Sequence, residues 1–74
     1  MQEEAEDETS PEERIKLGLE LVRQGRLDEG IESIEIAIEQ VPDKPDAHFN
    51  LGIAHTLKDN IPEAIRSYHE AIAI

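Results

Sequence analysis

The sequence predicts an all-α protein built from two copies of a helix–turn–helix unit. Three observations support this fold class. Apolar residues recur every three or four positions over most of the chain after residue 10, which is the spacing of one face of an α-helix. Pro and Gly residues interrupt these stretches where helices are expected to end. The chain is also similar to itself at an offset of 34 residues, a period typical of stacked helical repeats.

The internal similarity divides the chain. Of the thirty residue pairs that align between residues 11–40 and 45–74, eight are identical, whereas composition alone gives roughly two or three. The identical pairs are Pro11 and Pro45, Leu17 and Leu51, Gly18 and Gly52, Glu29 and Glu63, Ile31 and Ile65, Ser33 and Ser67, Ala37 and Ala71, and Ile38 and Ile72. We therefore expect an acidic tail over residues 1–10, a first repeat over residues 11–44, and a second over residues 45–74 that lacks a C-terminal capping helix.

The tail and the first helix are read from charge and capping residues. Residues 1–9 contain acids and no base, so we expect them to be disordered, either as a solvating tail or as an arm for a basic partner. Ser10 and Glu13 form a capping-box pattern around Pro11. The first helix is expected over residues 11–24, with Gly25 ending it.

The three remaining helices are read in the same way. A helix over residues 28–40 has an inner apolar stripe, and its carboxylates lie on the opposite side, where a straight helix face cannot supply the converging oxygens of a calcium site. Pro42 and Pro45 mark the connection to a helix over residues 45–58. A turn at Asp59-Asn60, where Asn tolerates the left-handed conformation, leads to a last helix from Pro62 onward. The repeated Gly18 and Gly52 predict a close approach of the second helix of each unit.

The period and the conserved small residues of the two units resemble the tetratricopeptide repeat (TPR) family. At the positions of the family pattern, the first unit has Arg14, Leu17-Gly18, Leu21, Gly30, Ile34, Ala37 and Pro42, and the second has His48, Leu51-Gly52, His55, Ala64, Tyr68 and Ala71. The small residues follow the pattern, whereas Arg14, Leu21, His48 and His55 replace its aromatic residues. The resemblance implies a right-handed α-solenoid fragment of four helices. It also implies a scaffold or adaptor that binds a peptide or a helix of another protein in a concave groove.

The resemblance assigns the groove to the first helix of each unit. The residues facing it would be Ile15, Leu19, Val22 and Arg23 in the first unit, with Glu12 and Lys16, and Phe49, Asn50, Ile53, Thr56 and Leu57 in the second, with Asp46. An alternative is that some of these residues pack the two helices against each other. Asn50 either hydrogen-bonds a bound peptide or is a plain polar helix residue. Ile15 and Leu19 replace the Lys and Asn of the carboxylate-clamping TPR proteins, so no such clamp is expected.

A second function is self-assembly. Because the chain has two repeats and no polar capping helix, the last helix would leave apolar residues partly uncovered. A dimer could form through this end of the chain. The residues concerned are Ile61, Ile65, Tyr68, Ile72 and Ile74.

Composition excludes several function classes. The net charge of −11 argues against binding nucleic acid or an anionic membrane. The chain has no Cys, no secretory signal and no apolar run long enough to span a membrane, so we expect a cytoplasmic protein. His48 and His55 are expected to pack between helices rather than to bind a metal. No catalytic motif is present, and neither a cofactor nor an enzymatic activity is expected.

Overall fold

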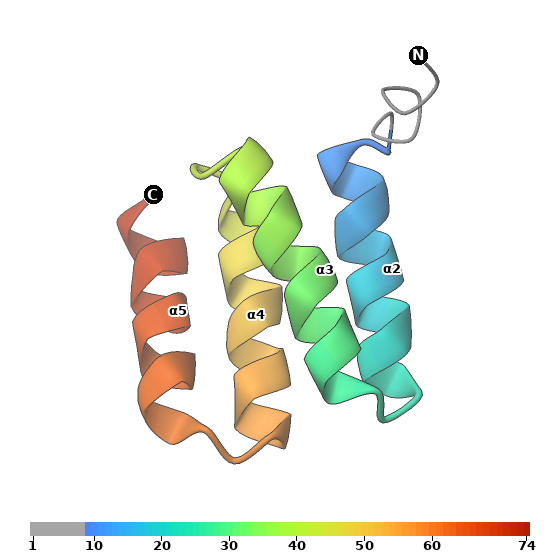
Figure 1. Cartoon of the computed structure of the whole chain (residues 1–74). Coiled ribbons are helices and arrows are strands. Elements are labelled where there is room, and N and C mark those ends of the chain that lie inside the picture. The colour runs from blue at the N-terminus through green and yellow to red at the C-terminus, as the bar shows by residue number, and fades with distance from the viewer. Residues whose placement is uncertain (1–8) are drawn as a thin grey trace.

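The chain folds into four α-helices and no strand within residues 9–74, which are the residues that the computed structural model describes. Figure 1 shows them as two antiparallel hairpins side by side. The helices are α2 (Pro11–Arg23), α3 (Leu27–Gln40), α4 (Pro45–Leu57) and α5 (Ile61–Ala73). The prediction of an all-α fold from two helix–turn–helix units is confirmed. Residues 1–8 of the predicted acidic tail lie outside the described part of the chain.

The start of α2 is fixed by the predicted capping box. The Ser10 Oγ accepts a hydrogen bond from the Glu13 backbone N–H at 3.1 Å, and the Glu13 carboxylate accepts one from the Ser10 N–H at 3.1 Å. These bonds satisfy two backbone donors that the helix itself leaves unpaired. Each of the other helices begins without a side-chain cap. Every helix start, and the end of each of the first three helices, lies within one residue of the predicted position.

The turn within each hairpin contains one residue in the left-handed region. These residues are Gly25, with φ 84°, and Asp59, with φ 65°, and they are equivalent by the repeat offset. Each allows the next N–H to bond back into the helix, from Arg26 to the Leu21 carbonyl and from Asn60 to the His55 carbonyl. The prediction that Asn60 adopts the left-handed conformation was wrong, since Asn60 has φ −101°. Asn60 donates the hydrogen bond to the His55 carbonyl, and the left-handed residue is the one directly before the donor, Asp59.

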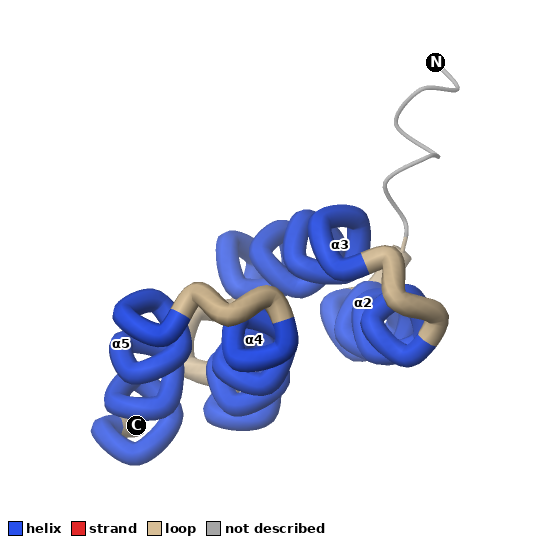
Figure 2. Tube along the Cα trace, turned by 90° about the horizontal axis from the view of Figure 1, so that it is seen from below, coloured by secondary structure: helices blue, strands red, loops and turns tan. Residues whose placement is uncertain are grey.

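The helices pack so that α3 lies against both α2 and α4. Contacts join α2 with α3, α3 with α4, α4 with α5, and α2 with α4. Viewed end-on in Figure 2, α3 lies above the line from α2 to α4, and α5 flanks α4 on its far side. The first helices of the two hairpins, α2 and α4, therefore share one face of the molecule, and α5 forms an edge.

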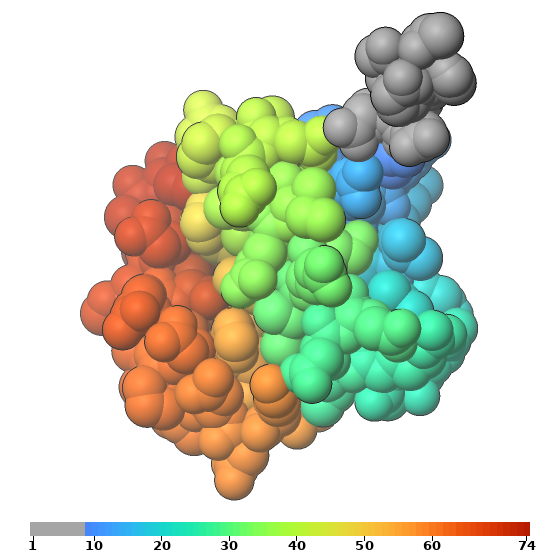
Figure 3. Space-filling view, in the orientation of Figure 1, coloured from blue at the N-terminus to red at the C-terminus, as the bar shows by residue number. Residues whose placement is uncertain are grey.

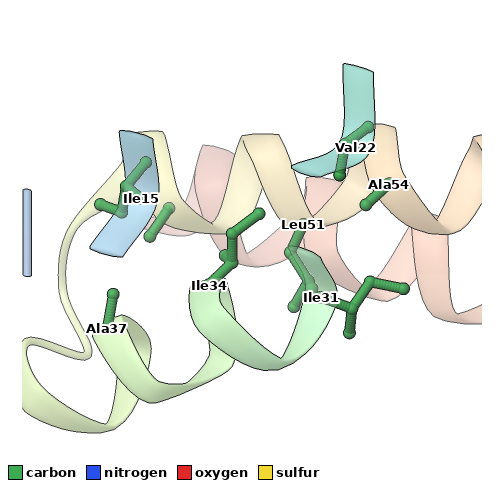
Figure 4. Close-up of a cluster of buried hydrophobic side chains, with 8 residues drawn as sticks. Ile15, Val22, Ile31, Ile34, Ala37, Leu51 and Ala54 are labelled. Atoms are coloured by element: carbon green, nitrogen blue, oxygen red, sulfur yellow. The ribbon is translucent and has the colours of Figure 1, made fainter. Parts of the chain in front are cut away.

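The core lies where α2, α3 and α4 meet. Ile34 of α3 is fully buried, and Figure 4 shows it among side chains from all three helices. The complete cluster is Ile15, Val22, Ile31, Ile34, Ala37, Ala47, Leu51 and Ala54. Ile15 and Val22, two of the predicted groove residues, are only 7% and 8% exposed. They therefore belong chiefly to the core.

Glycines allow the closest helix contacts. A Cβ atom added at Gly18 would lie 2.5 Å from Ile34 Cγ1 and 2.9 Å from the Gly30 carbonyl oxygen. A Cβ atom added at Gly52 would lie 2.5 Å from Cε1 of the Tyr68 ring. The predicted close approach of the second helix is confirmed in both hairpins, through the backbone and a buried side chain in the first and through an aromatic ring in the second.

Candidate functional site

Two clefts follow the line between α2 and α4. The larger, of about 530 Å³, is lined by Leu19, Val22, Arg23, Gly25, Leu27, Ile53 and Leu57. The smaller, of about 250 Å³, is lined by Glu12, Ile15, Lys16, Leu19, Lys44, Asp46 and Asn50. Leu19 borders both clefts, so we treat them as one surface and name it the α2/α4 furrow.

One end of the furrow is apolar with a cationic rim. Leu57 is 59% exposed here and lies near Leu19 and Ile53, which are half-buried. Arg23 stands at the rim, and its Nη1 donates to the Glu20 carboxylate at 3.0 Å. Because Glu20 is itself exposed, the guanidinium stays within reach of a second anionic or carbonyl group. This end can therefore take an apolar side chain and contact a polar group beside it.

The other end of the furrow carries charges of both signs. Lys44 Nζ lies 3.5 Å from the Glu12 carboxylate and ties the loop before α4 to the start of α2. A backbone hydrogen bond and, to a smaller extent, the Lys44 ammonium lower the pKa of Glu12, so this carboxylate is ionised at neutral pH. Asp46, Lys16 and Asn50 complete this end. Such a surface orients a polar or charged segment rather than anchoring it.

Ten of the twelve residues that the sequence analysis placed at the groove line the furrow, namely Glu12, Ile15, Lys16, Leu19, Val22, Arg23, Asp46, Asn50, Ile53 and Leu57. Phe49 and Thr56 do not. The Phe49 ring lies 5.7 Å from that of Tyr68. The Thr56 hydroxyl donates to the Gly52 carbonyl at 2.8 Å and lies 3.3 Å from the Tyr68 hydroxyl. These two residues therefore lie on the side of α4 that faces α5.

Sequence reasoning missed three residues of the furrow. Gly25 and Leu27 belong to the turn and second helix of the first hairpin, and Lys44 belongs to the loop before α4. They were missed because the groove was assigned only to the first helix of each unit. The position of Leu27 immediately after the turn was a usable signal, since it places the side chain beside the C-terminal end of α2.

The residues predicted for self-association lie on α5 and at its end. Ile61, Ile65, Ile72 and Ile74 are exposed, and Tyr68 is half-buried. They are therefore separate from the furrow, because none of them lines either of its clefts.

The histidines of α4 pack inside the molecule. His48 and His55 are both buried, as predicted. The Nε2 of His48 lies 2.8 Å from the Pro42 carbonyl oxygen, which can only accept, so this nitrogen carries the proton. Within residues 9–74, no three His, Asp or Glu side chains come close enough together to hold a metal ion.

No helix in residues 9–74 has both the length and the apolar character needed to cross a membrane.

Comparison with models of known protein families identifies a repeat family. A family model described as the tetratricopeptide repeat matches residues 15–74, which include nearly all of both hairpins. Among curated proteins, none matches the chain.

Proposed function

Because the chain belongs to the tetratricopeptide repeat family, whose repeats mediate protein–protein interaction, we propose that it binds a segment of another protein in the α2/α4 furrow. The observation that carries the proposal is the apolar surface of Leu19, Ile53 and Leu57, which lines a cleft and at which Leu57 is exposed to solvent. An apolar surface between two helices that remains open to solvent is a docking site for a peptide or a helix.

The furrow supports one orientation of the bound segment. An apolar anchor residue would enter the end formed by Leu19, Ile53 and Leu57, with Arg23 contacting a carbonyl or carboxylate beside it. The polar part of the segment would follow toward Glu12, Asp46 and Asn50. The net charge of −11 attracts a basic segment and raises its association rate. The proposal includes no catalytic step and no cofactor.

Selection from a library of random peptides tests this function. We expect the peptides that bind to carry an apolar anchor and a net positive charge, and to weaken as salt is added. The Leu57→Glu variant, which changes an exposed residue of the furrow, should bind these peptides with an affinity lower by about tenfold or more. The matched control is Ile72→Glu on α5, which lies outside the furrow and should leave their affinity unchanged. Selected peptides that bind both variants equally well would show that the furrow is not the site.

A further inference from the structure

The outer face of α5 is apolar and uncovered by any other described part of the chain. Ile65 is 51% exposed and Ile72 is 82% exposed. Their repeat equivalents on α3 are Ile31, which is 8% exposed, and Ile38, which is half-buried against the core. The difference arises because α4 packs against α3, whereas α5 contacts α4 alone.

The surface of α2 and α3 on which α4 packs, called the seat of α4 below, shows what kind of helix this architecture accepts. Figure 4 shows Leu51 and Ala54 of α4 pointing toward Ile31 and Val22 of the first hairpin. Ala47 and Ala54 are fully buried, and Leu51 lies between them and is buried as well. Small residues seven apart, with Leu four after the first, lie on one face of a helix and let the helix backbone come close to its neighbours.

The second hairpin repeats this seat without an occupant. Phe49 takes the place of Ile15, Thr56 that of Val22, Ile65 that of Ile31, and Ile72 that of Ile38. We name the surface formed by Phe49, Thr56, Ile65 and Ile72 the C-terminal seat. Phe49 and Ile65 are about half exposed, and Figure 3 shows α5 at the edge of the molecule. We propose that the C-terminal seat binds an amphipathic helix of another protein, with small residues at positions i and i+7, Leu at i+4, and a basic residue just before the helix.

The basic residue follows from the ion pairs around α4. Lys44, directly before α4, lies 3.5 Å from Glu12, and the repeat equivalent of Glu12 is the exposed Asp46. Asp46 is thus available to a cation that precedes the incoming helix. The ion pair at the other end of α4, Lys58 with Asp28, has no counterpart because Pro62 stands at the position equivalent to Asp28. The charge requirement therefore applies only to the N-terminal end of the occupant.

A second copy of this chain fits the seat poorly. Stacking would place α2 of one copy on α5 of the next, but Glu13 and Glu20 stand where α4 has its buried Ala47 and Ala54. Burying two carboxylates among the isoleucines of this face is strongly unfavourable. The outer face of α5 carries isoleucines rather than small residues, so two α5 helices lack the close-packing pattern of α4. A net charge of −11 on each copy adds repulsion.

The test uses the natural occupant of the equivalent seat as its probe. A fluorescently labelled peptide with the sequence of residues 44–58 is titrated with the folded chain, and binding is followed by anisotropy. We expect saturable binding and a gain of helical circular dichroism. A control peptide carrying Ala47→Glu and Ala54→Glu should bind at least about tenfold more weakly. It copies the two glutamates that α2 has at these positions.

Variants of the chain locate the binding and separate the alternatives. Ile65→Glu and Ile72→Glu should each lower the affinity for the peptide by about tenfold or more. Both residues are exposed, so the fold should persist. Leu17→Glu, at the opposite end and also exposed, is the matched control. Leu57→Glu affects the furrow only, so failure of one proposal is distinguishable from failure of the other.

Three outcomes would overturn the inference. The first is that the peptide does not bind. The second is that Ile65→Glu and Ile72→Glu leave peptide binding unchanged, which would indicate that the peptide replaces α4 in its own position. The third is a dimer in sedimentation velocity that Ile72→Glu dissociates. The last result would place a second copy on α5.

Discussion

The narrow crossing of α2 and α3 makes Gly18→Ala a sensitive probe of how this fold is packed. The added Cβ atom would meet Ile34 Cγ1 at 2.5 Å and the Gly30 carbonyl oxygen at 2.9 Å. Ile34 is fully buried, and the carbonyl belongs to the backbone of α3. The two helices must therefore move apart. In the repeat-equivalent variant Gly52→Ala, the three atoms nearest to the added Cβ all belong to the ring of Tyr68, a half-buried side chain that we expect to shift toward solvent.

The expected size of the effect follows from two opposing contributions. Overpacking a buried site costs about 1–3 kcal/mol, and we take the upper end where backbone must move. Replacing a helical Gly by Ala contributes about 1 kcal/mol in the stabilising direction. Gly18→Ala should therefore lower the free energy of unfolding by ~1–2 kcal/mol, whereas Gly52→Ala should change it by less than about 1 kcal/mol.

Urea unfolding followed by far-ultraviolet circular dichroism measures both variants. The m-value, which is the slope of the unfolding free energy against urea concentration, should stay unchanged, so that a shift of the midpoint reports stability alone. In a thermal melt, each kcal/mol corresponds to about 4–8 °C for a domain of this size. If Gly18→Ala proves as stable as Gly52→Ala, the close backbone crossing of α2 and α3 does not limit the packing and the reasoning is wrong.

Three further predictions concern a turn, an ion pair and the core. Asp59→Gly should stabilise the protein by ~0.5–1 kcal/mol in urea unfolding, because glycine adopts the left-handed conformation without strain; a loss of stability would contradict this. Hydrogen bonds from Arg26 lower the pKa of Glu29, so the stability difference between wild type and Glu29→Gln should be complete above about pH 5 and vanish as the pH falls through that lowered pKa; a difference that persists in acid would point to another cause. Ile34→Ala should cost ~2–5 kcal/mol and Ile72→Ala less than about 0.5 kcal/mol; equal losses in thermal melts would refute the burial assigned to them.

The helices and their order could be predicted because their signals are local. Apolar spacing, the capping box at Ser10 and the breakers at Gly25 and Pro42 all act within a few residues, and every helix boundary that the sequence defined was placed within one residue. The 34-residue offset supplied the pairing of helices into hairpins. The remaining local error, the left-handed residue at Asp59, came from preferring Asn by residue type over the hydrogen-bond geometry of the turn.

The burial of equivalent residues could not be read from the repeat. Leu17 and Leu51 are identical in type and position, yet Leu17 is exposed and Leu51 is buried. The reason is that α3 covers α4, while no helix in the described chain covers α2 on that side. Phe49 was assigned to the groove because the resemblance places it on the first helix of its unit, whereas its ring lies beside that of Tyr68 on α5. Glu13 and Ala47 are repeat equivalents, and the charged residue at the first position was the signal that α2, unlike α4, is not covered on that side.

The attachment of α5 to a single neighbour also determines how the native state opens. Since α4 is the one described helix that α5 contacts, α5 can detach while the cluster formed by α2, α3 and α4 stays intact. Amide hydrogens of α5 should therefore exchange with solvent through a local opening of lower free energy than global unfolding, and those of α3 through global unfolding. Because each helix is stabilised mainly by the neighbours it contacts, we expect local stability in this protein to decrease from α3 to α5.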